Sequence, residues 1–196
     1  GSIGEEKMKK LSNPLLLAIG ISIFFTSLFL DKNAQYSVSL IKNSSLDMIF
    51  GWFTHFINVF VIFILITTLF LWEEKKREWI FPLWLSFFIS IIFSYIIKIL
   101  ALRPRPIEIS QILTGLNYSF PSLHAAVSFA ALPILSKEFP KLRFFWVSFA
   151  FLVAFSRIYF EYHFLSDVVF GALLGYFIGV FVVHIEEKYR PFKFLK

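Results

Sequence analysis

The chain has 196 residues, of which 58% are hydrophobic and 28 are phenylalanine, and its formal net charge is +6. Soluble domains are about 45–50% apolar, so this composition excludes an ordinary soluble protein and indicates an integral membrane protein. The sequence has no cysteine, which excludes disulfides and thiol chemistry, and its basic residues gather in short interspan stretches, which disfavours nucleic acid as a partner.

Six apolar segments approach the length of about 20 residues that a helix needs to cross a bilayer. The expected fold class is therefore all-α, a polytopic membrane protein with six transmembrane helices in one bundle. Residues 1–7 look like the remnant of an expression tag before Met8, and residues 8–196 are expected to form a single domain. The predicted spans, in chain order, are Asn13–Leu30, Gly51–Trp72, Trp79–Leu100, Ser122–Leu135, Phe144–Phe160 and Ser166–Ile185.

A polar stretch, Asp31–Phe50, separates the first two spans. Apolar residues are scattered through it, so we expect a short amphipathic helix that lies on the outer membrane surface. In the last span, Gly171 and Gly175 form the G-x-x-x-G pattern that is typical of close helix packing.

The basic residues are divided unevenly between the two sides of the predicted bundle. Thirteen of the 19 Lys and Arg residues lie on the side that holds both termini, and six lie on the other. Because short cytoplasmic loops carry the excess of Lys and Arg, both termini are expected to be cytoplasmic in a multi-pass protein of the inner or plasma membrane. Three charged motifs then fall on the extracytoplasmic side.

The first motif follows the third span. Lys98 lies near the end of that span, and R-P-R-P supplies Arg103 and Arg105 between prolines that stop the helix and stiffen the loop. Guanidinium groups match phosphate oxygens and lysine adds a point charge, so Lys98, Arg105 and Arg157 together would clamp an anion. Taken singly, Lys98 and Arg157 are also consistent with cations that extend to the membrane interface.

The second motif, P-S-L-H, opens the fourth span. Ser122 is a suitable N-cap, and the free N–H groups at a helix start suit a phosphate. His124 lies two residues further on and, when protonated, can donate a proton to a leaving oxygen as a general acid. A polar residue at the interface is the alternative interpretation of His124.

The third motif ends with His163 and Asp167, four residues apart near the start of the last span. At this spacing both side chains share one helix face, and a carboxylate beside an imidazole makes the ring a better nucleophile. A pair that only caps the helix, with Ser166 or Asp167 as N-cap, is the alternative. No paired carboxylates occur at the spacing of a two-metal hydrolase, so neither a metal nor another cofactor is expected.

Together, the three motifs resemble those of the type 2 phosphatidic-acid phosphatase family, which also includes vanadium haloperoxidases and glucose-6-phosphatase. The family pattern is K-x-x-x-x-x-x-R-P, then P-S-G-H, then S-R-x-x-x-x-x-H-x-x-x-D. The stretches Lys98–Pro106 and Ser156–Asp167 agree with this pattern in spacing. In the middle motif, Leu123 stands at the family's glycine, and its side chain is expected to affect the fit of the leaving group.

The resemblance implies a role for each matched residue. His163 would form a phosphohistidine and Asp167 would orient it, while His124 would protonate the leaving group and then activate water. Arg103 and Glu161 have no family counterpart and are predicted as headgroup contacts. The residues that would hold phosphate oxygens are Lys98, Arg105, Ser122 and Arg157.

These roles predict a metal-independent lipid phosphatase that acts at the extracytoplasmic membrane face. Candidate substrates are polyprenyl (undecaprenyl) diphosphate, phosphatidic acid, phosphatidylglycerol phosphate and a lipid A phosphate, and phosphate or vanadate is expected to bind in the site. A phosphotransferase that uses an acceptor other than water stays open. A lipid-phosphate or anion transporter is disfavoured, because transport sites usually lie near the midplane of the bilayer, where the third and sixth spans are nearly uniformly apolar.

Overall fold

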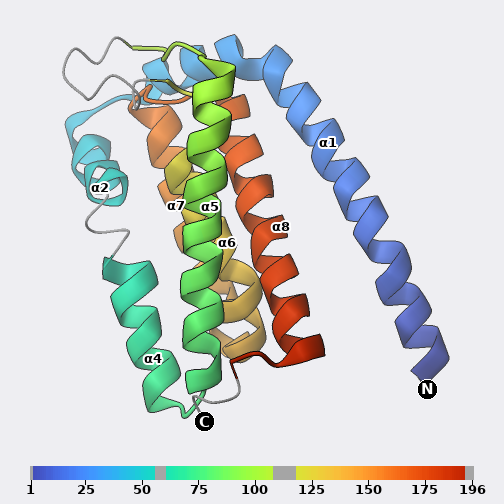
Figure 1. The fold of residues 1–196 in the computed structure, drawn as a ribbon. Helices are drawn as coiled ribbons and strands as arrows, with labels where there is room; N and C mark the ends of the chain where they lie inside the picture. The colour runs from blue at the N-terminus through green and yellow to red at the C-terminus, as the bar shows by residue number, and fades with distance from the viewer. Residues whose placement is uncertain (1, 56–60, 108–117, 193–196) are drawn as a thin grey trace.

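The computed structural model describes residues 2–55, 61–107 and 118–192, and all regular structure in these ranges is helical. A π-helical segment, Val61–Ile66, precedes α4, and 3-10 turns at Arg77–Trp79 and Pro140–Leu142 precede α5 and α7. The all-α prediction is confirmed within the described ranges. The α-helices are α1 (Ser2–Ile41), α2 (Ser44–Thr54), α4 (Thr67–Glu73), α5 (Ile80–Ala101), α6 (Leu123–Glu138), α7 (Arg143–Tyr159) and α8 (Leu165–Tyr189) (Figure 1).

Four helical stretches of the described chain are long and apolar enough to cross a bilayer, and they overlap the predicted first, third, fifth and sixth spans, although the first extends eleven residues beyond Leu30. The predicted fourth span is α6, which has 16 residues and packs against α5, α7 and α8. The predicted second span, Gly51–Trp72, is divided among α2, the π-helical segment and α4, and its residues 56–60 lie outside the described ranges. The number of six spans therefore stays a prediction. The four stretches are Leu17–Ile41, Arg77–Ala101, Pro140–Tyr159 and Leu165–Tyr189.

The stretch Asp31–Phe50 differs from the single surface helix that was expected. Helix α1 continues through its first part to Ile41, because no glycine or proline interrupts the helix there. A new helix, α2, follows Asn43, whose side chain caps it by accepting hydrogen bonds from two backbone N–H groups. Asp31 consequently lies within a long helix, beside the start of α8, where it contacts Ser166.

Helix α6 lies inside the bundle and packs closely on α8. Gly171, Gly175 and Gly179 of α8 face the backbone of α6, and a Cβ atom on Gly175 would lie 1.9 Å from the carbonyl oxygen of Ala126. The close packing predicted at Gly171 and Gly175 is therefore confirmed. Small residues on α6 complete this contact, because four of its alanines are fully buried: Ala125, Ala126, Ala130 and Ala131.

The two ends of the bundle differ in what they hold. The C-terminal ends of α5 and α7 meet the N-terminal ends of α6 and α8 at one end of the molecule (Figure 1). The start of α1 and the end of α8 lie at the opposite end (Figure 1). All three charged motifs therefore gather at one end of the bundle.

Candidate active site

Lys98 ends a buried stripe on α5. Ser90 and Ser94 precede it at four-residue spacing on the same face, and Lys98 is only 4% exposed. Its ammonium group donates hydrogen bonds to the carbonyl oxygens of Tyr118, at 2.6 Å, and Pro121, at 3.2 Å. The lysine therefore points toward the start of α6 and does not extend outward to the membrane interface.

Arg105 follows the end of α5 and reaches the turn between α7 and α8. Its Nη1 atom donates a hydrogen bond to the carbonyl oxygen of Tyr162 at 2.8 Å. The same atom lies 3.5 Å from Nε2 of His163. A guanidinium group at this position can hold an oxyanion directly in front of that ring nitrogen.

Arg157 occupies the last turn of α7 and is 8% exposed. Its Nη1 atom donates to the carbonyl oxygen of Thr54, at 2.9 Å, and to the hydroxyl group of the same residue. Its guanidinium carbon lies 4.6 Å from the centre of the Tyr162 ring. The end of α2 thus fixes this arginine. Thr54 was not among the predicted site residues, because a single threonine in an apolar segment carries no signal of its own.

His163 lies in the turn between α7 and α8 and is 2% exposed. Burial lowers the pKa of its imidazole well below the ordinary value of 6.5, and the positive charges of Arg157, Arg105 and Lys98 lower this pKa further. All three cations therefore act on the proton equilibrium of the ring, and Arg105 lies 3.5 Å from its Nε2 atom. The imidazole is neutral at neutral pH, which is the form that attacks an electrophile.

Asp167 lies in the first turn of α8, and its side chain is fully buried. Its Oδ2 atom accepts a hydrogen bond from the Phe164 N–H group at 2.8 Å and lies 3.6 Å from Nδ1 of His163. His163 and Asp167, which were predicted as a pair, thus face each other at slightly more than hydrogen-bond distance, as catalytic pairs often do before a substrate binds. The capping interpretation also holds in part, although the N-cap is Phe164 and not Ser166 or Asp167.

The start of α6 adds Ser122 and His124 to the same region. Ser122 is the N-cap, as predicted, although its side chain makes no capping hydrogen bond, and its backbone N–H group donates to the Asp167 carbonyl oxygen at 3.0 Å. The buried Ser122 hydroxyl group has no hydrogen-bond partner in the described part of the chain. His124 is half-buried and lies within electrostatic range of His163 and Arg157.

The two residues predicted as headgroup contacts have partners within the chain. Arg103 donates from Nη1 to Oδ1 of Asp167 and from Nη2 to Oδ2 of Asp31, both at 2.7 Å. Glu161 pairs with Lys42, which follows the end of α1. Asp31 was not among the predicted site residues, although a carboxylate at the end of an apolar segment is costly to place without a partner and is a signal of a functional contact.

The cluster as a whole is suited to an oxyanion. Lys98, Arg105 and Arg157 supply three positive charges around a neutral imidazole, and a second imidazole, His124, lies close by. Within the described ranges, no group of three or more His, Asp or Glu side chains is placed to hold a metal ion. Cations that can bind phosphate oxygens next to an imidazole are an arrangement that suits phosphoryl transfer.

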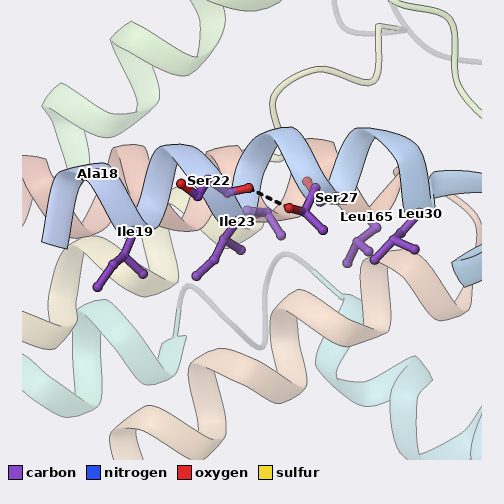
Figure 2. A pocket seen from close by; sticks show the side chains of 9 residues that line it. Ala18, Ile19, Ser22, Ile23, Ser27, Leu30 and Leu165 are labelled. Atoms are coloured by element: carbon purple, nitrogen blue, oxygen red, sulfur yellow. Dashed lines mark hydrogen bonds between the residues drawn. The ribbon is translucent and has the colours of Figure 1, made fainter. Parts of the chain in front are cut away.

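An apolar cavity of about 490 Å³ lies between α1 and α8 (Figure 2). Two hydroxyl groups in its lining donate to carbonyl oxygens of their own helix, so few polar groups are free inside it. At one end of the cavity, Leu30 and Leu165 directly precede Asp31 and Ser166, so the cavity ends beside the contacts of Arg103. The lining consists of Leu165, Val169 and one face of α1 from Ala18 to Leu30.

Comparison with known proteins agrees with this arrangement. A sequence profile described as the PAP2 superfamily matches residues 79–191, more than half of the chain, and this range contains all three motifs. An undecaprenyl-diphosphatase from Sulfolobus acidocaldarius is 28% identical over 184 residues, which are 88% of this chain and 89% of that protein. Undecaprenyl-diphosphatase BcrC from Bacillus subtilis is 25% identical over 154 residues, which are 76% of this chain and 80% of that protein.

Two solved structures are similar in fold. The transmembrane PAP2 type phosphatidylglycerolphosphate phosphatase from Bacillus subtilis superposes with a TM-score of 0.66 at 22% identity, over 88% of this chain and 98% of the other. LpxE from Aquifex aeolicus gives a TM-score of 0.63 at 27% identity, over 79% of this chain and 95% of the other. Both likenesses extend well beyond residues 79–191, so the fold is shared over most of the chain.

Proposed function

Since this chain belongs to the PAP2 superfamily and is a lipid phosphatase, we propose that it hydrolyses a polyprenyl diphosphate, such as undecaprenyl diphosphate, through a phosphohistidine and without a metal ion. The observation that carries this proposal is the position of His163, whose two ring nitrogens lie next to Arg105 on one side and Asp167 on the other. The substrate is proposed because two relatives that align with most of the chain are named undecaprenyl-diphosphatases.

The first chemical step forms the bond between nitrogen and phosphorus. Nε2 of His163 faces the cation at Arg105 and attacks the terminal phosphorus, while Asp167 holds the proton on Nδ1 and stabilises the positive charge that develops on the ring. The bond between phosphorus and the lipid's leaving oxygen breaks, and His124, which the negative charge of the bound substrate keeps protonated, donates a proton to that oxygen. From a diphosphate, the product that leaves is the lipid monophosphate.

The cations lower the barrier by holding the phosphate. In phosphoryl transfer, negative charge spreads over the three equatorial oxygens, which positioned cations stabilise. Lys98, Arg105 and Arg157 would bind these oxygens. The buried Ser122 hydroxyl group, which lacks a hydrogen-bond partner in the described ranges, would supply one more donor.

The second step releases phosphate. His124, now neutral, takes a proton from a water molecule, whose oxygen attacks the phosphorus of the phosphohistidine. The bond between Nε2 and phosphorus breaks, inorganic phosphate leaves, and His163 returns to its neutral form. If an alcohol replaced water in this step, the enzyme would be a phosphotransferase, and the product would be a new phosphoester.

The cavity between α1 and α8 is the site that we propose for the lipid tail of the substrate. The cavity between α1 and α8 is apolar, and its volume of about 490 Å³ is typical of ligand sites between helices. Because it ends at Leu30 and Leu165, beside the polar contacts of Arg103, we assign the hydrocarbon chain of the substrate to it. The phosphate would then reach the cations while the tail stays among apolar side chains.

The chain would sit in the inner or plasma membrane as six spans, with both termini in the cytoplasm and the site at the extracytoplasmic face. The excess of Lys and Arg on the side of the termini supports this orientation. Since the chain has no cysteine, single cysteines introduced at Ser44 and Glu74 test it directly. A membrane-impermeant maleimide added to intact cells should label Ser44→Cys and spare Glu74→Cys, and the reverse result would refute the orientation.

Phosphate release from purified enzyme tests the activity. In detergent with excess chelator, the enzyme should release phosphate from undecaprenyl diphosphate faster than from phosphatidic acid, phosphatidylglycerol phosphate or a lipid A phosphate. His163→Ala should abolish release, His184→Ala should not, and vanadate should inhibit as a phosphate mimic. Loss of activity with chelator, or release by His163→Ala at the wild-type rate, would contradict the mechanism.

A further inference from the structure

Arg103 joins carboxylates from two helices that are far apart in the sequence. Its Nη1 atom donates to Asp167 of α8, and its Nη2 atom donates to Asp31 of α1, both at 2.7 Å. We propose that Arg103 and Asp31 are positioning residues, which hold Asp167 in the orientation that it needs to act on His163. The inference rests on the proposed function. It implies that α1, which lies outside the matched range 79–191, contributes to the geometry of the catalytic site.

The two oxygens of Asp167 have different partners. Oδ1 accepts the hydrogen bond from Arg103, while Oδ2 accepts from the Phe164 N–H group and faces Nδ1 of His163. A carboxylate that is held at both oxygens cannot rotate about its last bond without losing a charge-assisted hydrogen bond. Removing Arg103 would free Oδ1 and allow Asp167 to turn away from the imidazole.

Asp31 in turn fixes Arg103 and the start of α8. Besides the bond from Arg103, Oδ2 of Asp31 accepts from the Ser166 hydroxyl group at 2.7 Å, and Oδ1 accepts from the Ser166 N–H group at 2.8 Å. Asp31 is only 6% exposed, and a buried carboxylate is stable only when it is paired and hydrogen-bonded. The residue next to Asp167 is therefore bound to α1 through both its backbone and its side chain.

These contacts favour positioning over the headgroup binding that the sequence suggested for Arg103. Both of its terminal nitrogens bond to oxygens of this chain, with a further bond from Nη1 to the Ser166 hydroxyl group at 2.7 Å. The guanidinium carbon also lies 4.1 Å from the centre of the Phe164 ring. To bind a headgroup, Arg103 would have to give up a partner that is buried and charged.

The test separates kcat from KM in purified Asp31→Asn, Arg103→Gln and the double variant, with a short-chain, water-soluble lipid diphosphate as substrate. Each single variant should lose kcat on the order of 10²-fold with little change in KM, because a misplaced catalytic group costs about this much. Since both residues act through one contact, the double variant should be no slower than the slower single variant. Glu187→Gln, which breaks an exposed ion pair with Lys137, is the matched control and should keep wild-type kinetics.

Arg103→Lys decides between the two roles even if Arg103→Gln fails to fold. Lysine keeps the charge but lacks the planar fork whose two nitrogens reach Asp167 and Asp31 separately, so the loss of kcat should persist. Full rescue by Arg103→Lys, a rise in KM alone, or wild-type kcat in Asp31→Asn would overturn the inference. If the wild type releases no phosphate from any lipid, the proposed function itself fails, which is a different result from an active wild type whose variants are unimpaired.

Discussion

Gly175 of α8 lies so close to Ala126 of α6 that a Cβ atom on the glycine would come within 1.9 Å of the alanine's carbonyl oxygen. That oxygen belongs to helical backbone and cannot rotate away. The same helix pair brings the Ser122 N–H group to the carbonyl oxygen of Asp167, at 3.0 Å. The packing of α6 on α8 and the geometry of the candidate site therefore depend on each other.

Gly175→Ala should separate the two helices. Overpacking of this kind costs about 1–3 kcal/mol, so we expect a lower unfolding temperature in detergent and a lower kcat. Gly51→Ala is the matched control, because a Cβ atom there meets only the Phe160 ring, at 4.0 Å. Equal effects of the two substitutions on unfolding temperature would show that the close contact does not determine helix packing.

The charged residues of the candidate site could be predicted from the sequence better than the residues that hold them in place. Spacing and residue type were sufficient to select His163, Asp167, Lys98, Arg105 and Arg157, because each is a charged or imidazole group at the end of an apolar segment. In the structure, Arg105 and Asp167 lie 3.5 and 3.6 Å from the ring nitrogens of His163, and the charges of Lys98 and Arg157 act on the pKa of the same ring. Their catalytic roles stay predictions.

The partners that hold these residues could not be predicted in the same way. Asp31 contacts Arg103, which is 72 positions away in the sequence, and Thr54 contacts Arg157, which is 103 positions away. Such contacts depend on how the helices pack, which hydropathy does not specify. The continuous helix through Ile41 was missed because the polar stretch after the first span was interpreted as a separate surface helix, although no glycine or proline between Asp31 and Ile41 ends the first helix.

The pH dependence of the reaction should reflect the pKa of His163. Burial, and then the charges of Arg157, Arg105 and Lys98, lower this pKa below 6.5, so neutral His163 should persist at mildly acidic pH. Arg105→Gln removes one of these charges and should raise the pKa of His163, which moves the acid limb of kcat/KM to higher pH.

The measurement compares pH–rate profiles of Arg105→Gln and wild type on one substrate, because the substrate's own phosphate titrates at about pH 6. Arg77→Gln serves as the control, since Arg77 lies against the ring of Trp72 at the other end of the bundle. If the acid limb of kcat/KM lies at the same pH in Arg105→Gln and in the wild type, then the pKa of His163 does not determine that limb.

The side chain of Leu123 should restrict the size of the leaving group that fits the site. It is half-buried, it packs against the hydrophobic core, and it directly follows the N-cap Ser122. Leu123→Gly should raise kcat/KM for bulky leaving groups relative to small ones, and it should lower the unfolding temperature because glycine costs a helix about 1 kcal/mol. Leu123→Ala separates loss of the side chain from the effect of glycine on the backbone. An unchanged preference in both variants would remove Leu123 from the specificity of the enzyme.

Filling the cavity between α1 and α8 should slow the hydrolysis of long-chain substrates and leave that of short-chain substrates unchanged. Ser22→Phe places a ring in the cavity, whereas Ile21→Phe changes an exposed position on the same helix that does not line it. We expect Ser22→Phe to lower kcat/KM for undecaprenyl diphosphate, with no change for a short-chain diphosphate. If both substrates, or both variants, are affected alike, then the cavity does not hold the substrate tail.

The covalent intermediate gives the most direct test of the mechanism. Enzyme mixed with a lipid diphosphate that is labelled on its terminal phosphate is quenched in alkali, which preserves a phosphorus–nitrogen bond, and its peptides are analysed by mass spectrometry. We predict a labelled phosphate on His163 in the wild type and none in His163→Ala. Rapid phosphate release without label on His163, or turnover by His163→Ala at the wild-type rate, would contradict the account.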